Sequence, residues 1–244
     1  MSVPLEEAEP ARARLLELFP DGFEEVEGVG RVELAAYTDA AGERALREEF
    51  ARVEADDVEP GWEDRWKAFH RPVRIGPLWV GPPWVEPASD AIAIVIDPGR
   101  AFGTGAHPTT RLTLELLLDV DRGALLDVGS GSGVLAIAAA KLGFAPVTGV
   151  DVDAAAVEVA RANAAANDVS IALRHLDALR DELPPADVAL ANIARDAVER
   201  LAPRLDCRVL VTSGYFDSEE RELPPFRHVR RVGVDGWAAD LHER

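Results

Sequence analysis

The sequence predicts an α/β protein, in which a mostly parallel sheet with helices on both faces follows a small α+β domain. From about residue 90 onward, apolar strand-like runs alternate with helical patterns, as in a parallel sheet covered on both sides. The first 57 residues hold shorter alternations in the order β-α-β-β-α-β, as in a split-βαβ sandwich. With 244 residues and 48% hydrophobic content, the chain can build one sizeable core and a second, smaller one.

Composition excludes several classes of protein. The net charge of −18 disfavours a general grip on nucleic acid, which needs basic surface, and would attract a basic partner. No apolar run is long enough to span a membrane, and the start of the chain lacks the apolar core of a signal peptide. The single cysteine, Cys207, fits a reducing compartment, and the five histidines lack metal-ligand spacing. We therefore expect a cytoplasmic protein without a metal site.

The order of elements divides the chain into three parts. In residues 1–57, SVPL, GFEEVEG, RVELAAYT and ARVEA are expected strands, and EEAEPARARLLELF and AGERALREEF are expected helices. Residues 58–88 are expected to be a linker, with a short helix at GWEDRWKAFH followed by extended segments broken by Gly and Pro. Residues 89–244 are expected to form the larger domain.

The larger domain has a regular order of predicted elements. The expected strands are AIAIVID, ALLDVG, PVTGVDVD, SIALRHLD, ADVALANI and CRVLVTSG, and the expected helices are TTRLTLELLLDV, VLAIAAAKLG, AAAVEVARANAAAN and DAVERLAPRL. Near the end of the chain, Asp235-Gly236 separates RHVRRVGV from GWAADLHE, which is a strong hairpin signal. The last strand is therefore expected to be antiparallel.

A glycine-rich turn after a buried strand predicts a ligand site. Gly129, Gly131 and Gly133 stand between a strand and a helix, where a crossover places a ligand beside the helix N-terminus. The spacing is G-x-G-x-G, whereas the dinucleotide fingerprint needs its third glycine one residue later. Asp127 precedes the turn, and its charge suits a ligand amino group better than a pyrophosphate. A tight turn without a ligand is the alternative, but it needs only one glycine.

Two further polar residues end neighbouring strands. Asp151 lies 22 residues beyond Gly129 (151 − 129), where a carboxylate can accept hydrogen bonds from both ribose hydroxyls of a nucleoside. Asn192 ends the fourth strand at the same edge of the sheet, where its side-chain carbonyl could hold an amine or where it could simply cap a turn. Together with Asp127, these positions favour S-adenosylmethionine over NAD as the cofactor.

Four segments carry a family resemblance. DPGRAFGTGAHPTT, LLDVGSGSGVLAIAAAKLG, GVDVDAAAVEVARANAAAN and LANI resemble the bacterial methyltransferases that modify large-subunit ribosomal protein L11. The resemblance covers roughly residues 60–215 and implies a class I methyltransferase: a Rossmann-like, seven-stranded, mostly parallel sheet after a ferredoxin-like, substrate-recognising domain. It implies an S-adenosylmethionine-dependent N-methyltransferase that acts on lysine side chains or the N-terminal amine of that basic ribosomal protein.

The resemblance also implies roles for residues. Thr110, Gly129, Asp151 and Asn192 would contact the cofactor, beside the other two loop glycines and Asp127. The opening loop, residues 97–111, would fold over the cofactor, with Gly103 and Thr104 against it. Three residues are candidates for the catalytic site: Asn192, Phe102 as a wall of the methyl-transfer chamber, and His107.

His107 would orient the loop, assist proton removal or serve only the structure. The chain departs from the family pattern at Arg100, Ser130, Asp206-Cys207 and Tyr215. Other acceptors for the same chemistry, a non-catalytic binding module and a nicotinamide enzyme are the alternative functions.

Overall fold

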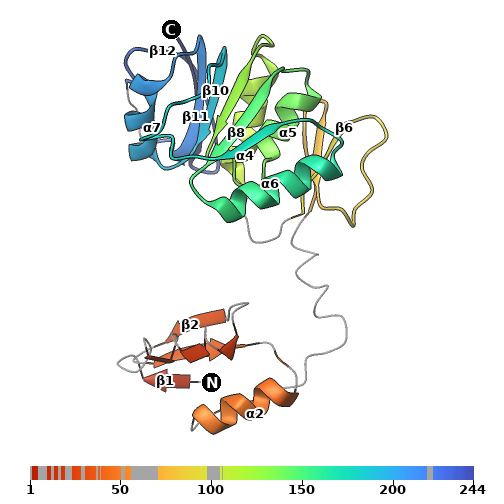
Figure 1. Ribbon diagram of the computed structural model, residues 1–244, viewed down its shortest axis with the longest axis vertical. Coiled ribbons are helices and arrows are strands. Elements are labelled where there is room, and N and C mark those ends of the chain that lie inside the picture. The colour runs from red at the N-terminus through yellow and green to blue at the C-terminus, as the bar shows by residue number, and fades with distance from the viewer. Residues whose placement is uncertain are drawn as a thin grey trace. The chain divides into compact units, whose positions relative to one another are not determined.

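The computed structural model forms two compact units, Met1–Trp62 and Glu63–Arg244 (Figure 1). The structure describes residues 2–4, 10–11, 14–15, 18–19, 24–28, 31–36, 38, 40–50, 53–55, 71–97, 105, 107–218 and 222–244.

The smaller unit is a three-stranded antiparallel sheet with helices. Strands β1 (Ser2–Pro4), β2 (Glu24–Gly28) and β3 (Arg31–Ala35) have the order β1-β3-β2, and α2 spans Ala40–Glu49. Along β3, buried Val32 and Leu34 alternate with exposed neighbours, as expected for a strand with one face on a core. The small core of this unit consists of Val3, Ala11, Leu15, Val32, Leu34 and Leu46.

One predicted strand of the smaller unit is missing from its described part. ARVEA was expected to form a fourth strand, but Val53–Ala55, the described portion of that segment, is in no strand. Val53 packs partly buried against the core, whereas Glu54 and Ala55 are both exposed, so the segment lacks the alternation of a half-buried strand.

The larger unit is organised around the predicted seven-stranded sheet. Its strand order is β12-β13-β11-β10-β7-β8-β9. The strands are β7 (Leu125–Val128), β8 (Val147–Asp151), β9 (Ala172–His175), β10 (Val188–Asn192), β11 (Val209–Phe216), β12 (Arg227–Val234) and β13 (Trp237–Glu243).

The pairing confirms the predicted antiparallel last strand. Strands β7 to β11 pair in parallel, whereas β13 is antiparallel to β11 and to β12. The predicted hairpin residues Asp235 and Gly236 have φ angles of 52° and 79°, as a two-residue type I′ turn requires.

Helices cover both faces of this sheet (Figure 1). They are α4 (Pro108–Leu118), α5 (Val134–Lys141), α6 (Ala154–Ala166), α7 (Arg195–Leu201) and the 3-10 turn η3 (Ala202–Arg204). Successive strand residues point to opposite faces, so Leu125 packs in one core with α4 and α5 while Leu126 packs in the other with α7. The strand alternation in the sequence therefore reflects two hydrophobic cores on the two sides of one sheet.

A second sheet corrects the expected domain boundary. Strands β4 (Val73–Ile75), β5 (Leu78–Gly81) and β6 (Ile92–Val95) form a separate three-stranded sheet, with β6 parallel to β5. Their buried side chains, such as Leu78 and Ile94, belong to the same core as α4 and α5. Residues 71–88 are therefore part of the larger unit, and the expected linker over 58–88 is wrong there. The helix expected at 61–70 lies outside the described residues.

At the edge of the main sheet, β12 carries exposed cationic side chains. Arg227 forms an ion pair with Glu243 of β13, and Arg230 forms one with Asp119 at the end of α4.

Among the described helices, none is long and apolar enough to cross a membrane.

Candidate functional site

The glycine-rich turn has the backbone shape that its three glycines permit. Gly129, Gly131 and Gly133 have φ angles of 71°, 55° and 82°, in the left-handed region that favours glycine. The amides of Gly129 and Ser130 donate hydrogen bonds to the Val150 carbonyl of β8, at 2.9 and 3.1 Å. A Cβ on Gly133 would lie 3.1 Å from the Cβ of Ala160, so this glycine also lets α5 approach α6.

Asp151 ties the end of β8 to this turn. Its Oδ2 accepts a hydrogen bond from the Gly131 amide at 2.9 Å, and its Oδ1 accepts one from the Asp153 amide at 2.9 Å. The carboxylate is half-buried. Each carboxylate oxygen has a second lone pair, so Asp151 can still accept two more hydrogen bonds.

Asp127 is fully buried beneath the turn. Its Oδ2 accepts a hydrogen bond from the Ser130 hydroxyl at 2.7 Å. Burial raises the pKa of this carboxyl to about 6, against the lowering effect of the Ser130 hydrogen bond. The Ala136 amide at the start of α5 also lowers this pKa through a hydrogen bond, so the buried carboxyl is held from both the turn and the helix.

The structure brings Asn192 and Thr110 together from positions 82 residues apart. The Asn192 amide nitrogen lies 3.5 Å from the Thr110 hydroxyl oxygen, at the long limit of a hydrogen bond. Asn192 ends β10, the strand between β7 and β11, and Thr110 is a buried residue in the first turn of α4. The ends of β7, β8 and β10 therefore place Gly129, Asp151 and Asn192 at one edge of the sheet.

His107 begins helix α4. Its Nδ1 accepts a hydrogen bond from the Thr109 amide at 3.3 Å and lies 2.8 Å from the Thr109 hydroxyl oxygen. Its ring also meets the edge of Trp237, with 4.9 Å between ring centroids. This geometry favours the structural and orienting roles of His107 over proton removal.

Two aromatic residues were not predicted as neighbours of this region: Trp237, which contacts His107, and Phe216, which contacts Trp237. Trp237 starts β13 and stacks on Phe216 at the end of β11, with 4.6 Å between centroids. Phe216 is 54% exposed, which is unusual for a large apolar side chain. The place of Trp237, directly after the hairpin turn, was the signal that could have found it.

Three of the expected site residues in the opening loop, residues 97–111, precede His107. Phe102, Gly103 and Thr104 lie outside the described residues. Within the described part of the chain, no group of three His, Cys, Asp or Glu residues could hold a metal ion.

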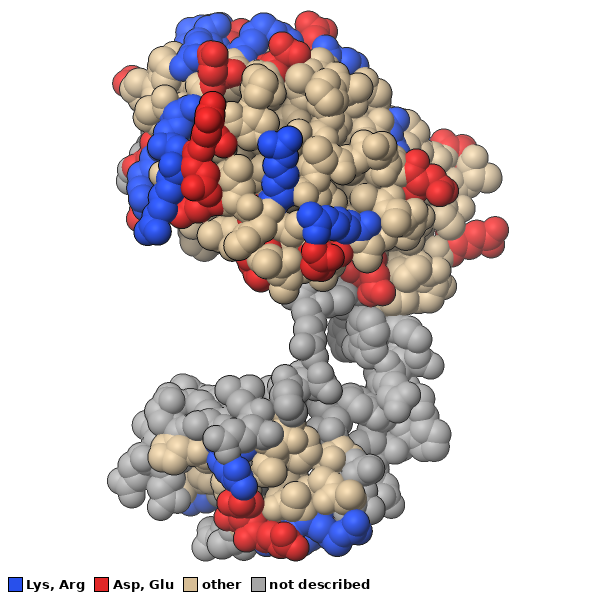
Figure 2. All heavy atoms as spheres, in the orientation of Figure 1, with Lys and Arg blue, Asp and Glu red and all other residues tan. Residues whose placement is uncertain are grey.

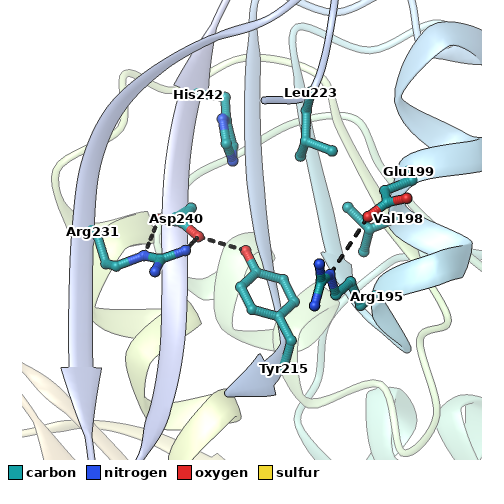
Figure 3. Close-up of a pocket in the computed structure, with 8 residues that line it drawn as sticks. All are labelled: Arg195, Val198, Glu199, Tyr215, Leu223, Arg231, Asp240 and His242. Atoms are coloured by element: carbon teal, nitrogen blue, oxygen red, sulfur yellow. Dashed lines mark hydrogen bonds and ion pairs between the residues drawn. The ribbon is translucent and has the colours of Figure 1, made fainter. Parts of the chain in front are cut away.

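A separate polar cavity lies between α7 and the strands β11 to β13 (Figure 3). It contains none of the predicted site residues and, at about 20 Å³, has room for one or two water molecules. Its lining is Arg195, Val198, Glu199, Tyr215, Leu223, Arg231, Asp240 and His242.

Hydrogen bonds tie the wall of this cavity together. The Tyr215 hydroxyl donates to Asp240 at 2.7 Å, and Arg231 binds both carboxylate oxygens of Asp240 at 2.8 Å. Burial alone would raise the pKa of Asp240, but the hydrogen bonds from Arg231, Tyr215 and His228 outweigh it and lower that pKa. Burial and the neighbouring Asp240 raise the pKa of Tyr215. The cluster therefore keeps the Asp240 carboxylate ionised, and the hydrogen bond from Tyr215 to Asp240 links β11 to β13.

Comparison with known proteins places this architecture in one family. A family model described as "Ribosomal protein L11 methyltransferase (PrmA)" matches residues 24–218. The ribosomal protein L11 methyltransferase of Pelobacter propionicus is 40% identical over 211 residues, which cover 75% of this chain and 66% of the relative. That of Caldanaerobacter subterraneus subsp. tengcongensis is 44% identical over 162 residues, covering 62% and 52%.

A solved structure supports the same assignment. The ribosomal protein L11 methylase of Lactobacillus delbrueckii subsp. bulgaricus has a TM-score of 0.64 and 29% identity, covering 72% of this chain and 99% of that one. The likeness confirms the predicted class I methyltransferase fold. The matched part of this chain spans between about half and two thirds of the length of these curated relatives. The chain belongs to the ribosomal protein L11 methyltransferase family.

Proposed function

We propose that this protein is an S-adenosylmethionine-dependent N-methyltransferase that modifies lysine side chains, the N-terminal amine or both in ribosomal protein L11. The observation that carries the proposal is the meeting of Asn192 and Thr110 at the strand edge that also holds Gly129 and Asp151. Membership of the family, whose named relatives are ribosomal protein L11 methyltransferases, supports L11 as the acceptor.

The residues at this edge fit the proposed cofactor. Asp151 retains two acceptor positions, which suit the two ribose hydroxyls. The carboxyl of Asp127, just before the Gly129 turn, favours a ligand with a nearby positive charge, such as the ammonium of a methionine moiety. When bound, the cofactor supplies a methyl group activated by a sulfonium.

Asn192 is the residue that we assign to the acceptor amine. Its amide nitrogen faces Thr110, which leaves Oδ1 as the atom that accepts a hydrogen bond from the amine. Thr110 is buried in α4, and its hydroxyl favours the orientation in which the Asn192 amide nitrogen faces it. The contribution of these residues is alignment of the amine at attack distance.

The amine must lose its proton before it can attack. A free lysine has a pKa near 10.4, and an apolar site next to a cationic group lowers it. With Nδ1 of His107 engaged at the helix start, this environment takes the place of a dedicated base.

Charge supports a basic protein as the partner. The net charge of −18 favours association with a basic protein. On the face of the larger unit that Figure 2 shows, acidic and basic side chains are mixed, with uncharged side chains between them. This arrangement offers no continuous basic surface to nucleic acid on that face.

We assign substrate recognition to the smaller unit, because the cofactor residues that the structure describes all lie in the larger one.

The decisive experiment incubates the protein with purified L11 and deuterated-methyl S-adenosylmethionine, followed by mass spectrometry of L11. Mass increments on L11 in the parent, and their loss in Asn192→Ala, are expected. Calorimetric titrations with S-adenosylmethionine and NAD run in parallel. Binding without methylation of L11 or of small amines would identify a binding module, and transfer to small amines alone would identify a different acceptor. Preferential binding of NAD would overturn the cofactor.

A further inference from the structure

Ile193, the residue after Asn192, packs closely against two glycines from neighbouring strands. A Cβ on Gly129, after β7, would lie 2.3 Å from Cγ2 of Ile193. A Cβ on Gly214, within β11, would lie 2.3 Å from the carbonyl oxygen of Ile193. Both distances are far below van der Waals contact, so neither position accepts a side chain unless Ile193 moves.

The two contacts differ in what they touch. Gly129 faces a side-chain methyl group, which a rotamer change can move. Gly214 faces the backbone of Ile193, since its Cβ would also lie 2.8 Å from the carbonyl carbon and 3.1 Å from the nitrogen. Gly214 also has a φ of +102°, and it forms the irregularity between Ser213 and Tyr215 in the pairing of β11 with β13. The clash of an added methyl group at Gly214 can be relieved only if the backbone of Ile193 or of β11 moves.

The backbone around Gly214 is anchored on both sides. The Ser213 hydroxyl donates a hydrogen bond to the Ala238 carbonyl at 2.7 Å, and this contact is buried. The Tyr215 hydroxyl donates one to Asp240, within the cluster shown in Figure 3. Hydrogen bonds hold β11 to β13 at both neighbours of Gly214. An added Cβ at Gly214 would therefore displace the backbone of Ile193 rather than that of β11, and Asn192 would move with Ile193.

We propose that Gly214 is a positioning residue for the methyl acceptor: it sets where the Asn192 amide lies relative to Thr110 and the Gly129 turn. The inference rests on the proposed function, because it assigns the acceptor role to Asn192. Gly214 reaches Asn192 through the Ile193 backbone, next to the pairing of Asn192 with Ser213.

The test compares Gly214→Ala with Gly143→Ala. Gly143 has a similar φ of +92° but nothing within 4 Å of an added Cβ, so its variant reproduces the backbone strain without the contact. At saturating S-adenosylmethionine, Gly214→Ala should lower the single-turnover rate about 100-fold, the effect of a shift of about 1 Å at a reacting group. Its cofactor dissociation constant should change less than threefold, and Gly143→Ala should keep the parent rate. A parent-like rate in Gly214→Ala would overturn the proposal.

A second readout is independent of methyl transfer. The side-chain amide signals of Asn192 in an NMR spectrum, assigned by their loss in Asn192→Ala, should shift in Gly214→Ala and stay in place in Gly143→Ala. Unchanged signals would refute the positioning role even if the protein methylated a different acceptor. If Gly214→Ala does not fold, Tyr215→Phe releases one anchor of the same segment. The Asn192 signals should then shift, and unshifted signals would count against the proposal.

Discussion

Asp127→Asn should stabilise the ligand-free protein at neutral pH while weakening its hold on the cofactor. Burial raises the pKa of Asp127 from 3.8 to about 6. The difference of about two pKa units, at 1.36 kcal/mol each, makes ionisation of the folded protein cost about 3 kcal/mol at pH 7. Asparagine keeps an acceptor for the Ser130 hydroxyl and carries no charge.

The sign of the pH dependence follows from the raised pKa. Between pH 3.8 and 6 the folded parent binds more protons at Asp127 than the unfolded chain does, so its stability falls as the pH rises through this window. Ionisation of Asp127 lowers the free energy of unfolding of the parent by about 1 kcal/mol near pH 4.5 and by about 3 kcal/mol at pH 7. In the variant, the amide hydrogens of the introduced asparagine would lack an acceptor, which offsets part of the gain by about 1–3 kcal/mol, but this offset does not vary with pH.

The assay is thermal unfolding of the parent and Asp127→Asn at pH 4.5 and 7, with and without S-adenosylmethionine. For a unit of this size, 1 kcal/mol corresponds to about 2–4 °C, so the melting temperature of the variant relative to the parent should rise by about 4–8 °C between the two pH values. The cofactor should raise the melting temperature of the parent more than that of the variant. A difference between the two proteins that is the same at both pH values would refute the reasoning about Asp127.

Three changes to the chain and one labelling experiment test the rest of the site and fold. Asp151→Ala should weaken S-adenosylmethionine binding about tenfold or more in calorimetry, because two ribose hydroxyls lose a charged acceptor; unchanged affinity would exclude the ribose role. Asn192→Ala should lower the single-turnover rate about 100-fold at saturating cofactor, and recovery of the parent rate at saturation would limit Asn192 to cofactor binding. A chain that starts at Glu63 should keep cofactor affinity and lose methylation of L11, whereas methylation at the parent rate would remove the smaller unit from substrate recognition. Because burial raises the pKa of Cys207 to about 11, iodoacetamide should label it about 100-fold more slowly at pH 8 in the folded protein than in urea, and equal rates would contradict its burial.

The sequence predicted the elements whose signals are local. Strand and helix periods, the Gly129 turn and the Asp235-Gly236 hairpin each depend on a few consecutive residues, and the larger unit has all of them. Asp127, Asp151 and Asn192 could be assigned to one edge because parallel strands end on the same side of a sheet. That rule needs only the order of the elements.

Features that depend on contacts between distant segments could not be predicted in this way. The patterns at Leu78 and Ile94 predict strands, but nothing local says that these strands form a sheet of their own on the core of the larger unit. The contact of Thr110 with Asn192 and the close packing of Gly214 against Ile193 likewise join segments that only the fold brings together. The positive φ of Gly214 has no signature in the sequence, because glycine is compatible with either sign.

The charged edge strand β12 has a consequence for association between copies of the protein. An edge strand presents unpaired backbone groups that a second chain can extend, and sheets resist this when charged side chains must first be desolvated. Arg227 and Arg230 of β12 are held in exposed ion pairs, so a strand approaching this edge would have to strip water from both partners of each pair. Two β12 edges that meet would also bring their arginines close together, and salt screens this repulsion between like charges. Self-association through β12 would therefore be favoured by high ionic strength, the reverse of the salt response expected when an acidic protein binds a basic partner.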